Sequence, residues 1–247
     1  MSISPAQYCA RRILRGKVVA FVGAGLSTES GVPDFRSTLG ARWTKYNPNE
    51  VATVEALQNN YDAFRDFQQL VIQDLEEIQP NYGHKFLAKW EEKGKILSVI
   101  TQNVDGLHYL AGSKNVYPIH GDVKNIYCCS CKKKSTVEAF MSNQKCECGG
   151  LLRPDIVLFG ETLNEEYLKK SSQNAKTCKT LIVFGSSLVV TPANYYPELA
   201  HKSGAKLIII NREPTPLDNI ADLVVHESIG DFLKTVTEEI EKLQNNN

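Results

Sequence analysis

The sequence predicts an α/β fold with a doubly wound parallel sheet and a smaller second domain. Two observations predict the sheet: short apolar runs recur along the 247 residues, and helical patterns lie between several of them. Strands covered by helices on both faces are nearly unbroken apolar runs, because neither face meets water. A third observation, a cysteine cluster where this alternation breaks, predicts the smaller domain.

Six apolar runs are the expected strands. They are Val18–Val22, Ile96–Ile100, Ile156–Phe159, Leu181–Phe184, Leu207–Ile210 and Leu223–Val225. Two segments carry apolar residues at three- and four-residue steps, which predicts one helix ending before Pro80 and another near the end of the chain. Their apolar residues are Phe64, Phe67, Val71, Leu75 and Ile78, and then Phe232, Val236, Ile240 and Leu243. The polar tail from Gln244 to Asn247 is expected to fray.

Two stretches without the strand–helix alternation predict the domain organisation. Residues 32–80 are mostly helical or loop, and residues 121–155 hold the cysteine cluster. We expect both to leave the main sheet and return to it, as a helical insert and a zinc-binding module that together form the small domain. The sheet domain then comprises residues 1–31, 81–120 and 156–247.

Composition excludes several classes of function. Lys plus Arg equals Asp plus Glu at 28 each, so no overall charge attracts nucleic acid or a membrane surface. No apolar run of ~18 residues predicts a membrane span, and the first residues do not resemble a signal peptide. Seven cysteines, an odd number, argue against a disulfide framework and for a reducing compartment, which we take to be the cytoplasm.

A glycine turn follows the first strand. Gly23, Ala24 and Gly25 would let the backbone approach a pyrophosphate at a helix N-terminus. Thr28 stands where the usual third glycine would be, and no acidic residue follows ~20 positions on. On this motif alone, an ordinary turn without a ligand is therefore as well supported as a dinucleotide-binding turn. Two further polar loops follow strands, at 185–187 and 211–213. Three such loops on one sheet edge favour a dinucleotide site.

The residues after Ile100 and around His120 have catalytic chemistry. His120 precedes Gly121 on a loop, where imidazole suits a general base and glycine allows close approach of a substrate. Gln102, Asn103 and Asp105 have the polarity to bind a carboxamide and a ribose. Each is also a common helix-capping or structural residue. His108, at an apparent helix start, is given a structural role.

The cysteine cluster predicts one structural zinc ion. Cys128 and Cys131 form a C-x-x-C pair, and Cys146 and Cys148 a C-x-C pair, with 14 residues between the pairs. Four thiolates close a tetrahedral site and leave no open position for catalysis. Cys129 is an alternative to Cys128, and free thiols are the alternative to a metal site. The neighbouring lysines, 132–134, are read as a solvated face, with nucleic-acid binding a minor alternative.

Seven motifs occur in the order found in sirtuins, and on them the chain is identified as a member of that family. They are GAGLSTESGVPDFR, TQNVDGLH, IHGD, the paired cysteines, LLRPDIVLFGE, GSSLVVTP and INREPTP. The resemblance covers about residues 17–230. It implies a Rossmann-like domain that holds NAD against a smaller helical plus zinc-binding domain.

The resemblance also implies roles for individual residues. Residues at the phosphates and riboses would be Ala24, Gly25, Thr28, Arg36, Gln102, Gly185, Ser186, Ser187, Asn211 and Glu213. The nicotinamide pocket would comprise Phe35, Val104 and Asp105, and Ile229 would lie beside the adenine. His120 would be the general base toward a ribose hydroxyl, and Asn103 would position a water or a hydroxyl. The segment Val157, Leu158, Phe159, Gly160 and Glu161 would pair with the substrate backbone, or else be a core strand.

The activity that the resemblance implies is NAD-dependent removal of acyl groups from lysine side chains of proteins. Nicotinamide would leave, and the acyl group would pass to ADP-ribose. Tyr61 and Arg65 do not match the pair that some sirtuins use for acidic acyl groups, so acetyl or another uncharged group is expected. The alternatives are an ADP-ribosyltransferase or NAD hydrolase on the same fold, and a zinc-ribbon binding module without catalysis.

Overall fold

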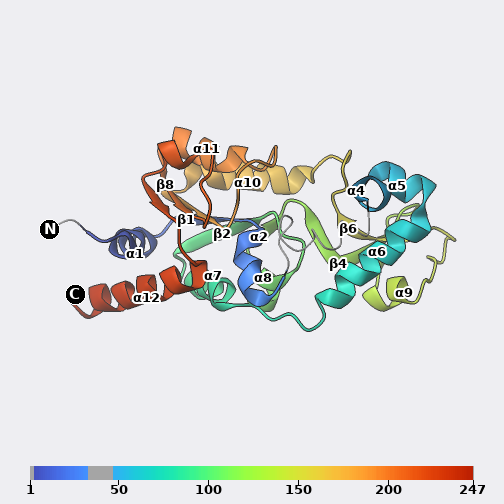
Figure 1. Cartoon of the computed structure of the whole chain (residues 1–247), viewed down its shortest axis with the longest axis horizontal. Coiled ribbons are helices and arrows are strands. Elements are labelled where there is room, and N and C mark those ends of the chain that lie inside the picture. Colours follow the sequence, from blue (N-terminus) through green and yellow to red (C-terminus); the bar gives the residue numbers. More distant parts are fainter. Residues whose placement is uncertain (1–2, 33–46, 247) are drawn as a thin grey trace.

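The computed structural model of the chain describes residues 3–32 and 47–246. These residues form a large lobe around a parallel sheet and a small lobe around an antiparallel sheet, at opposite ends of an elongated molecule (Figure 1). Both chain termini lie at the far end of the large lobe. None of the described helices has the length and apolar composition of a membrane span.

The large lobe contains six parallel strands in the order β3-β2-β1-β7-β8-β9. Their bounds are β1 Val18–Val22, β2 Ile96–Thr101, β3 Val116–Pro118, β7 Thr180–Phe184, β8 Lys206–Ile210 and β9 Leu223–Val225. The chain winds outward from β1 in one direction and from β7 in the other. The winding therefore reverses between β1 and β7, which makes this pair the topological switch point of the sheet.

Five of the six predicted strands are confirmed in this sheet. The prediction for Ile156–Phe159 is wrong: the strand there is β6 (Leu152–Ile156), which belongs to the small antiparallel sheet. The sixth strand of the large sheet is instead β3, three residues at its edge.

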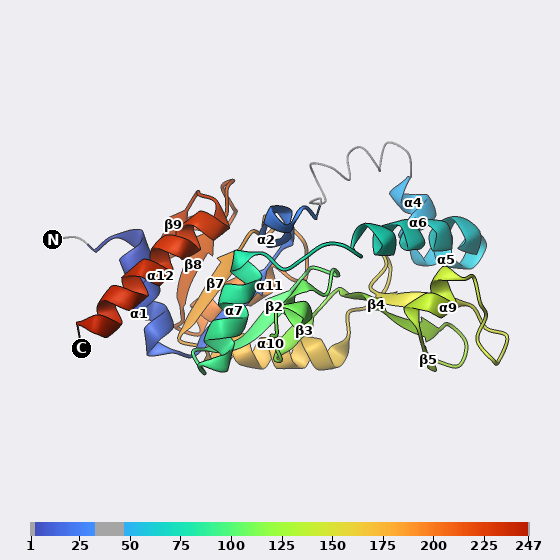
Figure 2. The same cartoon turned by 90° about the horizontal axis from the view of Figure 1, so that it is seen from below.

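Helices cover both faces of the parallel sheet, as a doubly wound fold requires (Figure 2). One face packs against α1 (Pro5–Arg15), α7 (Tyr82–Glu92) and α12 (Ile229–Asn245), and the other against α10 (Glu165–Thr177) and α11 (Tyr195–Lys202). The predicted C-terminal helix is confirmed as α12 and extends to Asn245, into the stretch expected to fray. All residues of β1 and β7 are buried, which explains the apolar runs Val18–Val22 and Leu181–Phe184.

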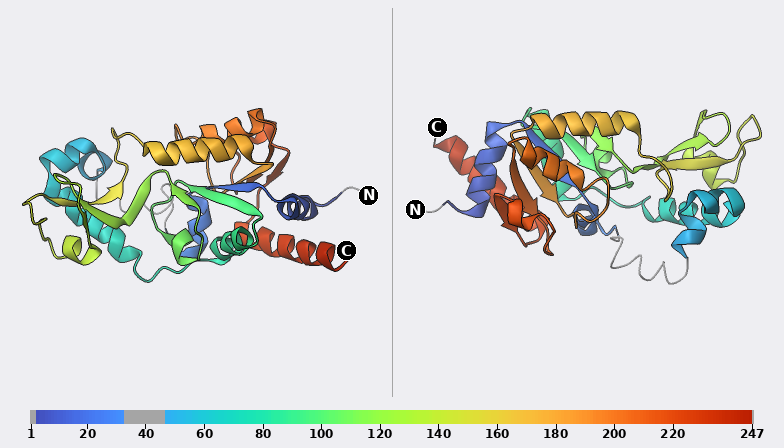
Figure 3. Two further views of the ribbon diagram at one scale, coloured as in Figure 1. Left: turned by 180° about the vertical axis from the view of Figure 1, so that it is seen from behind. Right: turned by 90° about the horizontal axis from the view of Figure 1, so that it is seen from above.

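The small lobe combines a three-stranded antiparallel sheet, β5-β4-β6, with short helices (Figure 3). Its elements are α4 Pro48–Val51, α5 Val54–Asn59, α6 Tyr61–Asp74, β4 Gly121–Cys128, β5 Lys134–Ser135 and α9 Val137–Met141, together with β6. Its core joins Ile72 of α6 to Ile126 of β4 and Phe140 of α9. Helix α6 ends at Asp74, earlier than predicted, yet Ile78 still packs on this core from the following loop. The predicted domain boundaries remain a prediction.

Candidate active site and zinc centre

The loops that carry most of the described residues predicted for the NAD site follow the carboxyl ends of the parallel strands. Gly23 follows β1, Asn103 follows β2, His120 follows β3, Gly185 follows β7 and Asn211 follows β8. Parallel strands present their carboxyl ends at one edge of the sheet, where open α/β folds bind ligands. The topology therefore brings these loops to a single edge, and hydrogen bonds between them show how closely they meet.

The two glycine loops at the switch point touch through their backbones. Gly25 donates its N–H to the carbonyl of Gly185 at 2.8 Å, and Gly23 donates to the carbonyl of Phe184 at 3.0 Å. Gly185 has φ +61°, and a Cβ there would lie 2.5 Å from the carbonyl carbon of Gly25. Only glycine fits this approach without a shift of the backbone. The sequence at the switch point thus serves close packing of two backbones.

A second bridge joins the loop after β2 to the loops after β7 and β3. Gln102 donates its side-chain amide to the hydroxyl of Ser186 at 2.8 Å. His120 Nδ1 lies 3.0 Å from the carbonyl oxygen of Gln102. Because a carbonyl oxygen only accepts, Nδ1 carries the hydrogen and Nε2 keeps its lone pair. Burial lowers the pKa of His120, and the bond to Gln102 opposes this only in part. A neutral imidazole with an available Nε2 is a competent general base.

Asp105 is the centre of a buried polar network. Its carboxylate accepts from the hydroxyl of Ser27 at 2.7 Å and from the N–H of Leu107 at 2.9 Å. Asn103 donates to the same hydroxyl at 3.0 Å and to the carbonyl of Gly23 at 3.1 Å. Burial raises the pKa of Asp105 although these bonds favour its charged form. Val104, between Asn103 and Asp105, joins β4 by accepting from the N–H of Val123 at 3.0 Å.

Ser27 and His84 belong to this network and were not predicted. Ser27 lies at the end of α2 (Ala24–Ser27), and His84 Nε2 lies 3.4 Å from its hydroxyl. His84 Nδ1 in turn contacts the side-chain oxygen of Asn81, the N-cap of α7. The only sequence signal for Ser27 was its place in the glycine turn. No local pattern singles out His84, because its partners lie on other elements. His108, given a structural role, is buried in α8 (Leu107–Leu110) beside the ring of His84.

The remaining predicted cofactor residues lie at the same edge. Thr28 donates its hydroxyl to the carbonyl of Gly25 at 2.9 Å. Asn211 donates its side chain to the carbonyl of Glu213 at 2.7 Å, which closes the loop after β8. Ile229 is buried at the first turn of α12. Its neighbours Ser228 and Gly230 both donate to the carboxylate of Glu29, next to Thr28 in the chain, so this helix start is fastened to the glycine turn.

Two predicted residues, Phe35 and Arg36, lie outside the described residues. The segment predicted to contact substrate, residues 157–161, is not a core strand: it follows β6 as a loop with one isolated parallel bridge, between Phe159 and Thr53. Val157 donates its N–H to the carbonyl of His120 at 2.9 Å, which places this segment directly beside the predicted base. The side chain of Phe159 is 63% exposed.

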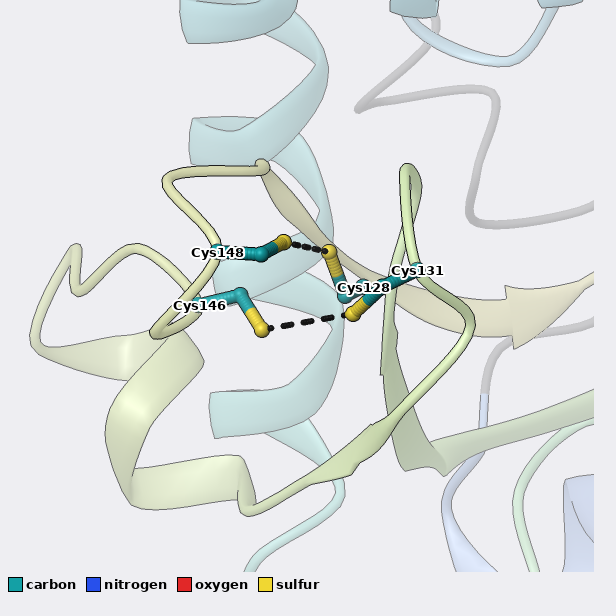
Figure 4. A group of neighbouring side chains, drawn as sticks. All are labelled: Cys128, Cys131, Cys146 and Cys148. Carbon is teal, nitrogen blue, oxygen red and sulfur yellow. Dashed lines mark hydrogen bonds between the residues drawn. The ribbon is translucent and has the colours of Figure 1, made fainter.

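The four predicted zinc ligands converge in the small lobe (Figure 4). The sulfurs of Cys128, Cys131, Cys146 and Cys148 all lie within 4.8 Å of one another, and no disulfide joins them. The closest pairs, Cys128 with Cys148 and Cys131 with Cys146, are 3.5 and 3.6 Å apart. Four sulfurs at ~2.3 Å from a central ion would be spaced much like this, so the cluster fits one tetrahedral zinc ion.

Local backbone geometry supports the zinc assignment. Hydrogen bonds from the backbone of Cys131, and to a lesser extent from Ser130, lower the pKa of the Cys128 thiol to about 6, although burial raises it. A thiolate is the form that binds the metal. A Cβ at residue 150 would lie 2.6 Å from the Cys128 sulfur, so Gly150 keeps the cluster open. The sulfur of Cys129 is not among the four that converge, whereas that of Cys128 is, as the spacing predicted.

Comparison with known proteins defines the family. The model of the Sir2 family matches residues 23–192, more than half of the chain. An NAD-dependent protein deacetylase from Halalkalibacterium halodurans is 48% identical over 220 residues, covering 88% of this chain and 92% of the relative. Another, from Sulfurisphaera tokodaii, is 44% identical and covers 90% of each chain. The chain therefore belongs to the Sir2 family, the sirtuins.

Solved structures share the fold over most of the chain. A Sir2 structure with a p53 peptide and NAD+ has a TM-score of 0.86 and 38% identity, and covers 96% of this chain and 98% of its own. A Sir2 complex with 2'-O-acetyl-ADP-ribose and deacetylated p53 peptide has a TM-score of 0.80 and 39% identity over 90% of this chain and 93% of its own. The predicted fold class, a Rossmann-like sheet with a smaller metal-binding part, is thereby confirmed.

Proposed function

We propose that this chain is an NAD-dependent protein lysine deacetylase. Acyl-lysine, NAD and water would become lysine, nicotinamide and O-acyl-ADP-ribose. The observation that carries the proposal concerns His120, a neutral imidazole at the sheet edge where the glycine loops meet, whose Nδ1 is bonded to Gln102 so that Nε2 keeps its lone pair. The relatives named above as NAD-dependent protein deacetylases support it.

The residues at this edge of the sheet would have separate roles in binding NAD and in transferring a proton. Bound NAD supplies the ADP-ribosyl group that accepts the acyl group, with nicotinamide as the leaving group. The glycines at the switch point let the backbone approach its pyrophosphate, and Ser186 and Ser187 offer hydroxyls to phosphate and ribose. Asp105, held by Ser27 and Leu107, would accept from the nicotinamide carboxamide. His120 Nε2 would take the proton of a ribose hydroxyl, and Asn103 would position a hydroxyl or a water.

The remaining cofactor contacts extend along the same edge. Ala24, Gly25 and Thr28 would face the phosphates, Gln102 the nicotinamide ribose, and Asn211 and Glu213 the adenosine ribose. Ile229 would lie beside the adenine, and Val104 beside the nicotinamide. Gln102 is already held in place by Ser186, so its side chain is oriented before a ligand arrives. The predicted contacts of Phe35 and Arg36 remain predictions.

Zinc would hold the small lobe together and take no part in the reaction. Four thiolates fill the tetrahedral positions and leave none for a water or a substrate. The ligands would be Cys128, Cys131, Cys146 and Cys148. Cysteines must stay reduced to bind zinc, which supports the proposal that the protein works in a reducing compartment such as the cytoplasm.

An uncharged acyl group, acetyl first, is the proposed substrate. Tyr61 donates its hydroxyl to the carbonyl of Leu152 at 2.7 Å. Arg65 forms ion pairs with Asp62 and Asp66 at 2.7 and 2.8 Å. Both side chains are therefore engaged within the chain and offer no free cation and hydroxyl for an acidic acyl group.

The test is to incubate the purified protein with NAD and matched peptides that carry acetyl-lysine, succinyl-lysine or free lysine. Mass spectrometry then follows nicotinamide, the peptide and acylated ADP-ribose. We expect nicotinamide release that depends on acetyl-lysine, in a one-to-one ratio with O-acetyl-ADP-ribose. Loss of NAD at the same rate with free lysine would identify an NAD hydrolase, and transfer of ADP-ribose to the peptide would identify a transferase.

A further inference from the structure

A buried arginine of the zinc-binding sheet is clamped to the segment beside His120. Arg153 lies in β6 and is only 3% exposed. Its Nη1 and Nη2 donate to the two carboxylate oxygens of Glu161 at 2.6 and 3.0 Å. This is the paired geometry in which a guanidinium holds a carboxylate most rigidly.

The clamp also fixes the backbone between its two members. Nη2 of Arg153 donates to the carbonyl of Ile156 at 2.6 Å, and Glu161 accepts from the N–H of Leu158 at 2.9 Å. Glu161 further donates its own N–H to the carbonyl of Leu158 at 2.9 Å. Burial alone would raise the pKa of Glu161, but Arg153 and Leu158 lower it overall, so the carboxylate stays charged. The turn from residue 156 to 161 is therefore closed at both ends.

The other side of the turn is tied to the helical insert. Phe159 donates its N–H to the carbonyl of Ala52 at 3.0 Å and accepts from the N–H of Val54 at 3.2 Å. Its ring nevertheless stays largely exposed. The backbone of the turn is thus held by the helical insert, while the side chain of Phe159 faces solvent.

Arg153 connects this turn to the metal-binding half of the small lobe. Its guanidinium carbon lies 5.6 Å from the ring centre of Tyr127 in β4 and 6.0 Å from that of Phe64 in α6. In the β4–β6 register, Tyr127 pairs with Arg153 and the next pair is Cys128 with Leu152. One residue along the ladder thus separates the clamp from a zinc ligand.

We infer that Arg153 is a positioning residue for the protein substrate, acting through Glu161. The clamp sets the backbone of residues 157–160 in the shape that accepts an extended acyl-lysine peptide. Glu161 serves by holding this turn rather than by touching the peptide. A peptide that binds along a backbone edge gains affinity when that edge is ordered beforehand. The inference rests on the proposed deacetylase function, and it names Arg153 as the residue that holds the substrate-binding turn in shape.

The experiment replaces Arg153 and measures each substrate separately. For Arg153→Gln we expect the KM of the acetyl-lysine peptide to rise about tenfold, since one partner of a buried charged pair is lost. The kcat and the Kd of NAD, measured by calorimetry without peptide, should stay within about twofold of the parent values. Glu161→Gln should raise the peptide KM likewise. The double variant should raise it no further, because the two changes remove one interaction.

Controls separate positioning from general stability. Arg153→Lys, which keeps the charge but not the paired geometry, should recover only part of the peptide affinity. Arg65→Gln removes a partly exposed arginine of the same lobe, whose ion pairs are with the exposed Asp62 and Asp66, and should leave the peptide KM unchanged. If Arg153→Gln and Glu161→Gln lowered the melting temperature and the active fraction but left the peptide KM unchanged, the role would be structural and the inference overturned. If the parent enzyme released no nicotinamide in response to acetyl-lysine, the proposed function itself would fail.

Discussion

The two lobes are stable for different reasons. The large lobe buries whole apolar strands under helices on both faces, in two extensive clusters. The core of the small lobe is one small cluster, and a predicted zinc ligand, Cys128, is part of it. A small core seldom outweighs the conformational entropy of its own chain. Hydrophobic burial is therefore expected to stabilise the sheet domain by itself, whereas the small lobe is expected to depend on its zinc ion as well.

Removal of one zinc ligand is expected to have the largest effect. Cys128→Ser should abolish stoichiometric zinc and the peptide-dependent activity, because the metal contributes directly to the folding of this lobe. Hydrogen exchange should lose protection in β4 and β6 but keep it in β1 and β7. Cys129→Ser, one residue away and outside the cluster, is the matched control and should keep one zinc per chain. Equal loss of protection in both lobes of Cys128→Ser would contradict the claim that only the small lobe depends on zinc.

Replacement of the base tests chemistry at the border between the lobes. His120→Ala should lower kcat by about 10²- to 10⁴-fold, the usual contribution of general base catalysis. NAD binding should persist, since the glycine loops proposed to receive the pyrophosphate are unchanged. The rate of product formation in a single turnover and the Kd of NAD should be measured on the same preparation of the variant. A variant that bound NAD normally and kept its full rate would remove His120 from the mechanism.

Two glycines of the large lobe allow a smaller, controlled change. Gly185→Ala should weaken NAD binding about tenfold or more, because its Cβ would meet the backbone of Gly25 and separate the two glycine loops. Gly204 also has a left-handed φ, +88°, but a Cβ there meets nothing within 4 Å. Gly204→Ala should therefore cost only the backbone strain, about 1–2 kcal/mol of stability, and leave the Kd of NAD unchanged. Similar losses of NAD affinity in both variants would contradict the proposal that NAD binds at the two glycine loops of the switch point.

The buried histidines of the large lobe predict a modest dependence of stability on pH. Burial lowers the pKa of His84 to about 4 and that of His108 well below its ordinary value, with His84 adding to the latter effect. Both stay neutral in the folded chain, while the unfolded chain protonates them near pH ~6.5. Their contribution to the free energy of unfolding is therefore complete above pH ~6.5 and is lost as the pH falls toward 4. The slope is about 1.4 kcal/mol per pH unit for each imidazole.

Urea unfolding of the parent and of His84→Gln between pH 5 and 7.5 checks this prediction. The unfolding free energy of the variant should change less steeply with pH than that of the parent, by about 1.4 kcal/mol per pH unit, because one imidazole fewer takes up a proton on unfolding. Because zinc loss at low pH affects both proteins alike, the difference between them isolates the histidine. Parallel stability curves would mean that His84 is protonated in the folded state.

The fold of the large lobe was predictable because its strands are buried on both faces. Such strands are apolar along their whole length, and five of them carried that signal. Four of the described strands were missed or misplaced, and two of them, β3 and β6, lie at sheet edges and contain Pro118 and Pro154. An edge strand tolerates proline because one side of its backbone needs no ladder partner. In β6, the charge of Arg153 is neutralised by a residue eight positions later, which no local pattern reveals.

The site was predictable where chemistry and spacing sit together in the chain. The cysteine pairs, the glycine turn and the His-Gly pair each carry a recognisable chemical requirement. Ser27 and His84 could not be predicted, because their role depends on Asp105, which reaches them only through the tertiary fold. The same holds for Glu29, whose carboxylate caps a helix about 200 residues further along the chain.

The most direct test is a crystal structure with NAD and an acetyl-lysine peptide bound. The loops after β1, β2, β3 and β7 should surround one dinucleotide, with Nε2 of His120 within hydrogen-bonding distance of a hydroxyl on the nicotinamide ribose. The peptide should run along residues 157–160, with its acetyl group directed to the same ribose. A dinucleotide bound elsewhere, or an imidazole of His120 turned away from the ribose, would contradict the proposed function.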